Sequence, residues 1–409
     1  MTEADCLTVD ELKPARRALR IAVVTETYPP EVNGVALTIA CFIRGLVARQ
    51  HDVQLIRPRQ KAGGNAEGDG GLSEVLMRGL PIPRYPDLRM GMPAKNALIR
   101  MWTRQRPDLV HIVTEGPLGW SALQAAKRLK LPVTSDFRTN FHAYSRHYGM
   151  GWLSKPIFLY LRKFHNRTDC TMVPTMAMKR ELEAAGFQNV AVVARGVDTR
   201  RFDPAKRSEA LRASWGAQPA DRVALCVGRL APEKNLSAIF AAFAAMRAAD
   251  ANIRLVLVGD GPAREDVARR CPAAYLAGMK TGEDLAAHYA SADMFLFPSL
   301  TETYGNVTPE AMASGLPLVA YNYAAASQLI RHGENGMLAS LDRSDEFTRH
   351  ALWLATHPDA ARAMGEAARR TACENDWDRI VGQLERVFET VLADQTGGRV
   401  RSGPLALAG

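Results

Sequence analysis

The sequence predicts an α/β protein of two domains, each a parallel sheet wound on both faces by helices. Apolar runs of strand length alternate with segments whose apolar residues recur at helical spacing. The alternation stops at a polar connector, residues 195–204, and then starts afresh. A chain of 409 residues is long enough for two such domains, each with its own core. Two sheets of this kind that face each other leave a cleft between them, the usual position of a ligand.

The first domain is predicted at residues 20–194, after a loose leader of residues 1–19 that lacks a clear apolar period. Five glycines among residues 63–71 predict a mobile loop. The predicted strands are Ile21–Thr25, Val53–Ile56, Leu109–Val113, Pro132–Ser135, Thr171–Pro174 and Val190–Val193, and the predicted helices are 35–46, 118–129 and 176–185.

The second domain is predicted at residues 205–377. A terminal helix, residues 378–393, is expected to pack back on the first domain, and a Gly-rich tail, residues 394–409, is expected to be disordered. The predicted strands of the second domain are Val223–Val227, Arg254–Val258, Ala274–Leu276, Met294–Phe297 and Leu318–Tyr321, with a helix between each pair.

Composition places the chain among soluble globular proteins, with 47% hydrophobic and 23% charged residues. No apolar run approaches the ~18 residues of a membrane span, and the N-terminus lacks the apolar centre of a signal peptide. A cytoplasmic location is therefore expected. The six cysteines are scattered singly without metal-ligand spacing, which favours reduced, mostly buried thiols over disulfides or zinc.

The net charge of +9 is concentrated in the first half of the chain. Residues 1–194 hold 27 Lys and Arg against 17 Asp and Glu, a net charge of +10, which leaves −1 for the rest. A basic domain suits an acidic partner such as an anionic membrane surface or a nucleic acid. Nothing resembles a nucleic-acid module, so we expect no nucleic acid. Solvated surface charge is the simpler alternative.

Two carboxylates, Glu302 and Glu310, flank a turn that follows a buried strand. Thr308 can cap a helix whose first position suits Pro309, which places Glu310 in the first turn. Backbone N–H groups at such a helix start can hold an anion, and the carboxylates can accept hydrogen bonds from sugar or ribose hydroxyls. By itself the pair also fits a solvated loop acid and a helix-start acid.

Two further loops follow strands of the second domain. Gly228 and Arg229 come directly after a strand, and Lys234 lies five residues later, so two cations stand beside a helix start and could hold a diphosphate. Gly259 and Gly261 follow the next strand, where glycines let the backbone approach a ligand. Surface cations and ordinary turn glycines are the alternatives for each motif alone.

Together these motifs resemble, in order and spacing, the retaining glycosyltransferases of family 4, which have the GT-B fold of two Rossmann-like domains. The resemblance extends from about residue 20 to residue 392. Residues 137–174 look most similar to the branch that contains sulfoquinovosyldiacylglycerol synthases and GDP-mannose-dependent mannosyltransferases. The resemblance implies a nucleotide diphosphate sugar as co-substrate, with no metal and no other cofactor.

The resemblance also implies roles for individual residues. Arg229 and Lys234 would neutralise the departing diphosphate, Glu310 would hold the ribose hydroxyls, and Glu302 would face the transferred sugar. The remaining donor-binding positions that it implies are Asn33 and Gly34 in the first domain and Gly228, Gly259, Gly261, Tyr304, Gly305, Asn306 and Val307 in the second, with the base near 276–280.

One position departs from the family pattern. Relatives often have a His after the strand that corresponds to residues 132–135, and here Arg138 stands at that position. Arg138 could stabilise developing charge or a charged sugar, but it is always protonated and cannot act as a base. His142, one turn further on, is either its replacement or a structural residue.

Two other segments each allow two interpretations. Asp376 and Asp378 spell the DXD pattern of metal-dependent glycosyltransferases, but they directly precede the last helix, where Asp is a capping residue. Residues 152–167 combine aromatic, apolar and basic side chains, which suits either an anionic membrane surface or a core helix with a basic outer face.

The sequence therefore predicts a retaining, metal-independent hexosyltransferase that uses GDP-mannose or a UDP-hexose and glycosylates a lipid-linked or glycan acceptor. It is expected in the cytoplasm or at the inner face of the membrane, with the first domain on the acceptor side. The alternatives are a GT-B epimerase of nucleotide sugars and a non-catalytic protein that binds them.

Overall fold

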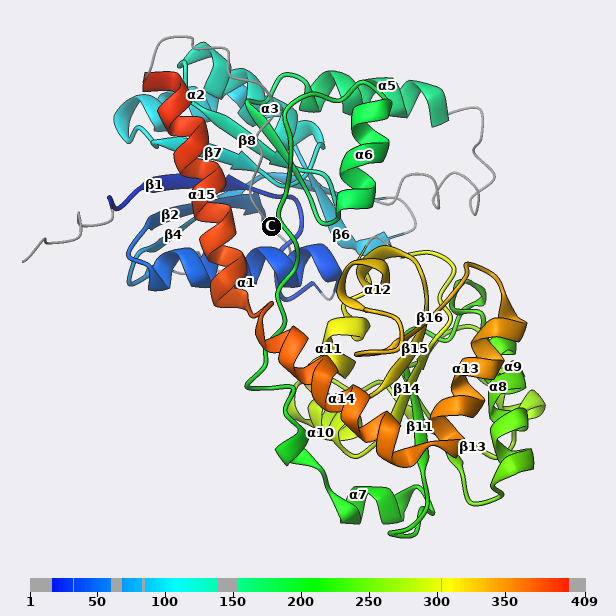
Figure 1. Ribbon diagram of the computed structural model, residues 1–409. Coiled ribbons are helices and arrows are strands. Elements are labelled where there is room, and N and C mark those ends of the chain that lie inside the picture. Colours follow the sequence, from blue (N-terminus) through cyan, green and yellow to red (C-terminus); the bar gives the residue numbers. More distant parts are fainter. Residues whose placement is uncertain are drawn as a thin grey trace, which may run out of the picture.

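The computed structural model describes residues 17–31, 33–59, 68–82, 85–138, 154–302 and 304–396. It consists of two α/β domains that follow one another along the chain, and Figure 1 shows the last helix returning from the second domain to the first. Each domain has its own parallel sheet, as predicted, and hydrophobic clusters fill both faces of each sheet.

The first sheet has eight strands in the order β10-β9-β8-β7-β1-β2-β4-β3, parallel except for the last pair. The strands are β1 (Arg20–Val24), β2 (Asp52–Pro58), β3 (Gly68–Asp69), β4 (Leu72–Met77), β7 (Leu109–Ile112), β8 (Val133–Asp136), β9 (Cys170–Val173) and β10 (Val190–Val192). The hairpin β5 (Gly79–Ile82) and β6 (Tyr85–Gly91) stands apart from the sheet, and the helices are α1 (Gly34–Ala48), α2 (Lys95–Arg104), α3 (Pro117–Arg128), α5 (Ser154–His165) and α6 (Met176–Ala184).

Residues 68–104 contain structure that the sequence did not predict. The predicted glycine-rich loop lies partly outside the described residues, and its described end contains β3. Strand β4 then pairs parallel with β2, and the hairpin and α2 follow. The described residues of β4 are mostly half-buried, and only two residues of α2, Leu98 and Trp102, are buried, so the apolar signal of these elements is weak.

The second sheet has six parallel strands in the order β13-β12-β11-β14-β15-β16. The strands are β11 (Val223–Val227), β12 (Arg254–Val258), β13 (Ala274–Gly278), β14 (Met294–Phe297), β15 (Leu318–Tyr321) and β16 (Met337–Ala339). The helices are α7 (Glu209–Ser214), α8 (Leu236–Ala249), α9 (Arg264–Arg270), α10 (Gly282–Ala290), α11 (Val307–Ala313), α12 (Ala324–Leu329), α13 (Ser344–Thr356) and α14 (Pro358–Cys373), with short 3₁₀ turns η2 (Pro204–Lys206) and η3 (Pro232–Lys234).

The strand order of the second sheet reverses between β11 and β14. In an open parallel sheet, the loops that leave the carboxyl ends of the strands on either side of such a reversal diverge and leave room for a ligand. The loop after β11 carries Arg229 and Lys234, and the loop after β14 carries Glu302. The topology therefore brings the predicted cations and one of the predicted carboxylates together.

The last helix, α15 (Trp377–Thr396), packs on α1 of the first domain. Its apolar residues Ile380, Val381, Leu384 and Phe388 complete the cluster formed by β1, β2 and α1. The helix begins one residue before the predicted start and extends through Thr396, so the predicted boundary of the disordered tail at residue 394 falls inside the helix.

The end of the predicted leader and the predicted connector both have ordered contacts. Leu19 at the end of the predicted leader is buried, and its N–H donates to His51 Nδ1 at 3.1 Å. In the connector, Phe202 is buried, and Arg369 of α14 donates to backbone oxygens of Thr199 and Phe202. The connector is therefore packed against the second domain, because its carbonyl groups are bound by a neighbouring arginine.

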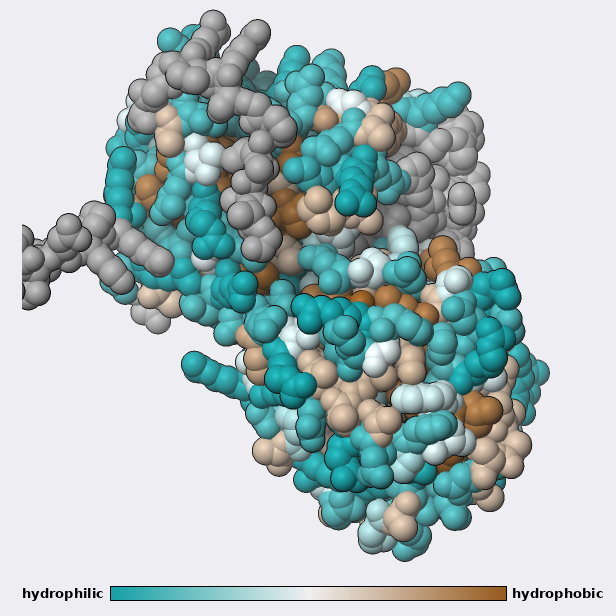
Figure 2. All heavy atoms as spheres, viewed as in Figure 1, coloured by the Kyte–Doolittle hydropathy of each residue, from teal (hydrophilic) through white to brown (hydrophobic). Residues whose placement is uncertain are grey.

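The described part of the chain holds five free cysteines, three of them buried, and Cys6 lies outside it. None of the helices in these described ranges has the length and apolarity needed to cross a membrane. On the face shown in Figure 2 the surface is mostly hydrophilic, with hydrophobic residues visible where the two domains meet.

Candidate active site

Lys234 and Glu302 form an ion pair between the two loops at the strand reversal. Lys234 Nζ donates to Glu302 Oε1, and the same oxygen accepts from Ser299 Oγ at 2.8 Å. Both side chains are more than four-fifths buried. The turn η3 brings Lys234 there, and Asn235, in the left-handed conformation with φ +50°, starts α8 directly after it.

Arg229 lies in the same loop but is exposed, and it makes no hydrogen bond or ion pair with any residue that the structure describes. Lys234 Nζ also lies 5.4 Å from the centre of the Phe297 ring, the last residue of β14. The site thus offers one cation held by a carboxylate and one cation in solvent, both beside the carboxyl end of β11.

The predicted glycines have a packing role in this loop cluster. A Cβ atom at Gly259 would lie 1.9 Å from the carbonyl oxygen of Gly228, and one at Gly261 would lie 2.4 Å from that of Leu230. Gly259 also has φ +134°, which side chains rarely adopt. Both glycines are therefore required for the contact between the loops after β11 and β12, and their contact with a donor stays a prediction.

Glu310 lies in the first turn of α11, as predicted, and its Oε2 accepts from the hydroxyl of Tyr289 at 2.9 Å. Burial raises the pKa of Glu310 to about 7, although the Tyr289 hydrogen bond opposes the shift. The predicted cap was wrong: α11 begins at Val307, so Thr308 and Pro309 lie inside the helix and are buried. The helix begins two residues earlier than predicted, and Asn306 before it is already in the helical conformation.

The turn before α11 contacts the connector between the domains. Gly305 has φ +87°, which turns the chain from Tyr304 towards the helix. The hydroxyl of the buried Tyr304 donates to the backbone oxygen of Arg195 at 3.0 Å, and Asn306 Oδ1 accepts from Arg195 Nη1 at 3.1 Å. Two of the four predicted donor-binding positions from Tyr304 to Val307 thus contact Arg195 of the connector.

In the first domain, Asn33 and Gly34 lie at the start of α1. Asn33 Oδ1 accepts from the N–H groups of Val35 and Ala36, so this side chain caps the helix. A Cβ atom at Gly34 would lie 2.9 Å from Arg195 Nη1. The glycine therefore lets the guanidinium of Arg195 approach α1.

Arg138 follows β8 and is buried against Asp136. Its Nε and Nη2 donate to the two carboxylate oxygens at 2.7 and 3.3 Å, and its guanidinium lies 5.1 Å from the centre of the Phe42 ring. Burial opposes ionisation of Asp136, but Arg138 and then His111 outweigh it and hold the pKa of Asp136 well below its usual range. His142 lies outside the described residues.

Sequence reasoning missed Arg195 and Glu26. Arg195 lies in the predicted polar connector, yet it is only 5% exposed. It contacts three of the predicted donor-binding residues, Gly34, Tyr304 and Asn306. Glu26, in the loop after β1, accepts from the N–H of Leu118 at the start of α3, and burial raises its pKa to about 7. A charged residue directly after a strand was the available signal for Glu26, whereas no sequence pattern marks the burial of Arg195.

The DXD-like pair has structural contacts. Asp376 Oδ1 accepts from the N–H of Arg379 at 2.9 Å, the geometry of a cap at the start of α15. Asp378 Oδ1 accepts from Arg49 Nη2 at 2.7 Å and so joins α15 to α1. Asp376 therefore caps the last helix, and Asp378 joins that helix to the first domain.

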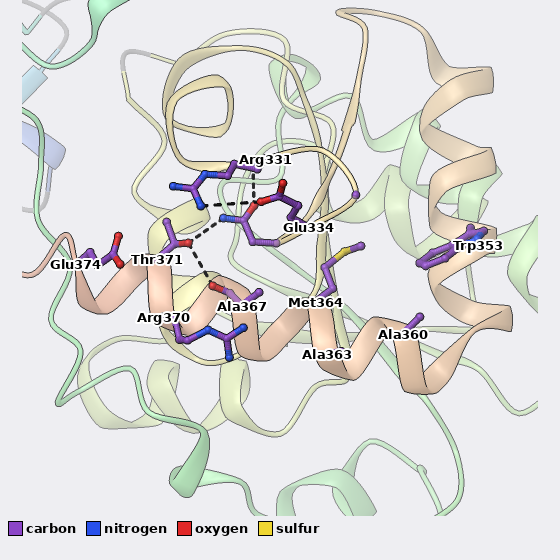
Figure 3. Close-up of a pocket in the computed structure, with 12 residues that line it drawn as sticks. Arg331, Glu334, Trp353, Ala360, Ala363, Met364, Ala367, Arg370, Thr371 and Glu374 are labelled. Carbon is purple, nitrogen blue, oxygen red and sulfur yellow. Dashed lines mark hydrogen bonds and ion pairs between the residues drawn. The ribbon is translucent and has the colours of Figure 1, made fainter. Parts of the chain in front are cut away.

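A separate pocket of about 560 Å³ lies between the loop before β16, α13 and α14. Asn335 of that loop donates to the hydroxyl of Thr371 at 2.9 Å. Figure 3 shows Thr371 with Arg331 and Arg370 on the pocket wall. None of the predicted site residues lines this pocket.

Comparison with known proteins agrees with this geometry. The family model described as Glycosyltransferase Family 4 matches residues 32–201, and the model described as Glycosyl transferases group 1 matches residues 221–357. Among solved structures, sucrose-phosphate synthase from Thermosynechococcus elongatus superposes with a TM-score of 0.73 at 16% identity, covering 92% of this chain and 99% of that one.

Curated relatives match along most of the chain. A GDP-mannose-dependent alpha-mannosyltransferase of Mycobacterium tuberculosis is 31% identical, over 92% of this chain and 98% of the relative. The sulfoquinovosyl transferase SQD2 of Arabidopsis thaliana is 29% identical, over 92% of this chain and 74% of the relative. With two family models side by side along the chain and a relative of more than 30% identity over nearly its full length, this protein belongs to glycosyltransferase family 4 and is a glycosyltransferase with the GT-B fold.

Proposed function

We propose that this enzyme transfers a hexose from a nucleotide diphosphate sugar to a lipid-linked or glycan acceptor, with retention of the anomeric configuration and without a metal ion. The observation that carries the proposal is the Lys234–Glu302 ion pair beside Arg229 at the strand reversal of the second sheet. The mycobacterial relative uses GDP-mannose by its name, which supports a nucleotide diphosphate sugar as donor.

Donor binding separates the ion pair in this proposal. The diphosphate takes Lys234 and Arg229 as counter-charges, and Glu302, released from Lys234, accepts hydrogen bonds from hydroxyls of the sugar. Glu310, in the first turn of α11, accepts hydrogen bonds from the ribose in this proposal.

The chemical step then needs no protein nucleophile. The bond between the anomeric carbon and the diphosphate oxygen breaks, and the two cations stabilise the charge that develops on the leaving group. An oxygen of the departing phosphate takes the proton of the acceptor hydroxyl, and the new bond forms on the same face of the sugar. Two cations at the diphosphate would supply the stabilisation that a metal ion supplies elsewhere.

An acceptor at a membrane would be presented to the first domain. Helix α5 exposes Ile157, Leu159 and Tyr160 next to the basic Lys155 and Lys163, and this domain carries the excess positive charge. Apolar side chains with flanking lysines favour an anionic lipid surface. We therefore propose peripheral association with the cytoplasmic face of a membrane.

The test is incubation with GDP-mannose, UDP-glucose and UDP-glucuronate in the presence of total lipid, with release of the nucleoside diphosphate as the measurement. Lys234→Ala and Glu302→Ala should abolish release, whereas Glu334→Ala, an exposed glutamate on the separate pocket, should not. Full activity of either site variant would overturn the assignment. Loss of activity with EDTA would contradict the metal-free mechanism, and the anomeric proton of the product, observed by NMR, reports retention.

A further inference from the structure

Two arginines are buried at the junction of the domains with too few acids to balance them. Arg138 is 3% exposed at the end of β8, and Arg195 is 5% exposed in the connector. Asp136 is the single carboxylate that pairs with either of them among the residues that the structure describes. The segment that follows Arg138, residues 139–153, contains no Asp or Glu.

Each of the two guanidiniums has a nitrogen atom without a hydrogen-bond partner. Within the described ranges, Arg138 Nη1 and Arg195 Nε are buried and make no hydrogen bond. The one side-chain acceptor for Arg195 is the neutral amide of Asn306. A buried charge without its full set of partners is costly, so this arrangement is expected where a ligand completes it.

The electrostatics agree with an uncompensated positive cluster. Burial, and then the positive charge of Arg138, lower the pKa of Arg195 to about 10, against weaker opposing effects of Tyr304, Asp136 and Glu302. Both guanidiniums also lie against α1: a Cβ atom at Gly34 would be 2.9 Å from Arg195 Nη1, and the guanidinium of Arg138 lies 5.1 Å from the centre of the Phe42 ring.

This region is the sugar side of the proposed donor site. The guanidinium of Arg195 lies 5.7 Å from the centre of the Tyr304 ring, two residues after Glu302. The diphosphate already has Arg229 and Lys234, which lie in the loop after β11. A second pair of cations beside Glu302 would be surplus for a neutral hexose. An acidic sugar next to Glu302 needs such a pair, because it would otherwise be repelled by that carboxylate.

We propose that Arg138 and Arg195 bind an acidic group on the transferred sugar, so that the donor is a nucleotide diphosphate uronate or a similarly acidic hexose. A guanidinium matches the two oxygens of a carboxylate and keeps its charge when buried. This inference rests on the proposed transfer of a hexose from a nucleotide donor and specifies the class of that hexose.

The test compares donors that differ only at C6 of the sugar. UDP-glucose is paired with UDP-glucuronate, GDP-mannose with GDP-mannuronate, and UDP and GDP alone report the nucleotide. Affinity is measured by calorimetry, and each ligand's effect on the melting temperature is measured in parallel. For the base that binds, we expect the uronate to bind ~10- to 100-fold more tightly than the hexose, the effect of one charged hydrogen-bonded contact.

The key variant is Arg195→Gln, because Arg195 has no carboxylate that its removal would leave unpaired. We expect this variant to melt at the same or a higher temperature than the wild type, to bind the nucleoside diphosphate normally, and to lose the preference for the uronate. The double variant Asp136→Asn/Arg138→Gln removes a carboxylate and its guanidinium partner together, and it should also lose the preference for the uronate. The matched control is Arg200→Gln, which changes an exposed arginine of the same connector and should keep the preference for the uronate.

Equal binding of hexose and uronate by the wild type would overturn the inference, and turnover of the neutral hexose in that case would leave the proposed transfer intact. If Arg195→Gln weakened the nucleoside diphosphate, the hexose and the uronate by the same factor, the pair would be part of the diphosphate site and the inference would again be wrong. If no nucleotide or nucleotide sugar bound at all, both the inference and the proposed function would fail.

Discussion

Lys234 and Glu302 form an ion pair between two loops, although the two residues are 68 positions apart in the sequence. Ser299 donates to the same oxygen of Glu302, Oε1, that accepts from Lys234. Each side chain is thus held in a fixed position before a donor arrives. When the donor binds and takes Lys234 as its counter-charge, both side chains are already at the site, which lowers the cost of arranging charges there.

The ion pair predicts a specific pattern of stability. Lys234→Met and Glu302→Gln should each lower the free energy of unfolding by about 1.5–3 kcal/mol, the range for a charged hydrogen bond whose partner is left behind. The double variant should lose less than the sum, because no lone charge remains. Urea unfolding of the four proteins measures the coupling, and strict additivity would mean that the two side chains do not interact in solution.

The raised pKa of Glu310 predicts that stability falls as the pH rises from about 4.5 to about 7. Its pKa is raised from 4.5 to about 7 in the folded protein, so the folded state holds the proton that the unfolded state releases. Stability contributed by the protonated form is complete below pH 4.5 and is lost by about pH 7, a difference of roughly 3 kcal/mol. Glu310→Gln cannot titrate, so its unfolding curve should lose this part of the pH dependence.

The same carboxyl group should make nucleotide affinity depend on pH. An ionised Glu310 accepts hydrogen bonds from ribose hydroxyls more strongly than a protonated one. Affinity for the preferred nucleoside diphosphate should therefore rise by up to ~10-fold between pH 6 and pH 8. The phosphate of the ligand titrates in the same way with the wild type and with Glu310→Gln. The difference between their two affinity–pH profiles therefore reports the Glu310 side chain, and identical profiles would contradict the assignment.

The attachment of α15 to the first domain depends on Glu385. This buried carboxylate pairs with Arg49 and accepts from His51 Nε2 at 2.9 Å. Glu385→Ala leaves His51 without its acid and leaves Arg49 with Asp378 alone, so the free energy of unfolding should fall by about 3 kcal/mol. Glu389→Ala, exposed one turn later on the same helix, should change it by less than about 0.5 kcal/mol. Equal effects of the two substitutions in thermal unfolding would contradict this role.

Helix α5 predicts how the enzyme meets a membrane. Leu159 is 53% exposed, and Leu159→Glu should reduce co-sedimentation with anionic phospholipid vesicles. The matched control is Leu341→Glu, a leucine with 50% exposure in the second domain, which should sediment like the wild type. If both variants bind vesicles equally well, α5 is not the contact surface.

Much of the fold could be predicted because the relevant signals are local. Strands such as 223–227 and 294–297 are buried on both faces of a parallel sheet and therefore read as continuous apolar runs. Residues 72–91 gave no such signal, because the described residues of β4 are mostly half-buried and the hairpin contains Pro81 and Pro86. Secondary structure at the edges of a domain depends on contacts that the sequence does not display.

The candidate site also contains residues that the sequence could bring together and one that it could not. Arg229, Lys234 and Glu302 could be brought together from the sequence, because each follows a strand and parallel strands end at one edge of the sheet. Arg195 could not, because its burial results from the contact of the connector with Tyr304, Asn306 and α1.

The sequence by itself determined two wound sheets, the loops that carry the chemistry and the family to which the chain belongs, since each of these depends on the order and spacing of residues. Only the tertiary structure decided that Lys234 and Glu302 pair with each other and that Arg138 and Arg195 are buried near one carboxylate. Burial and the balance of charge arise from how two distant segments pack, and a one-dimensional pattern contains no record of that packing.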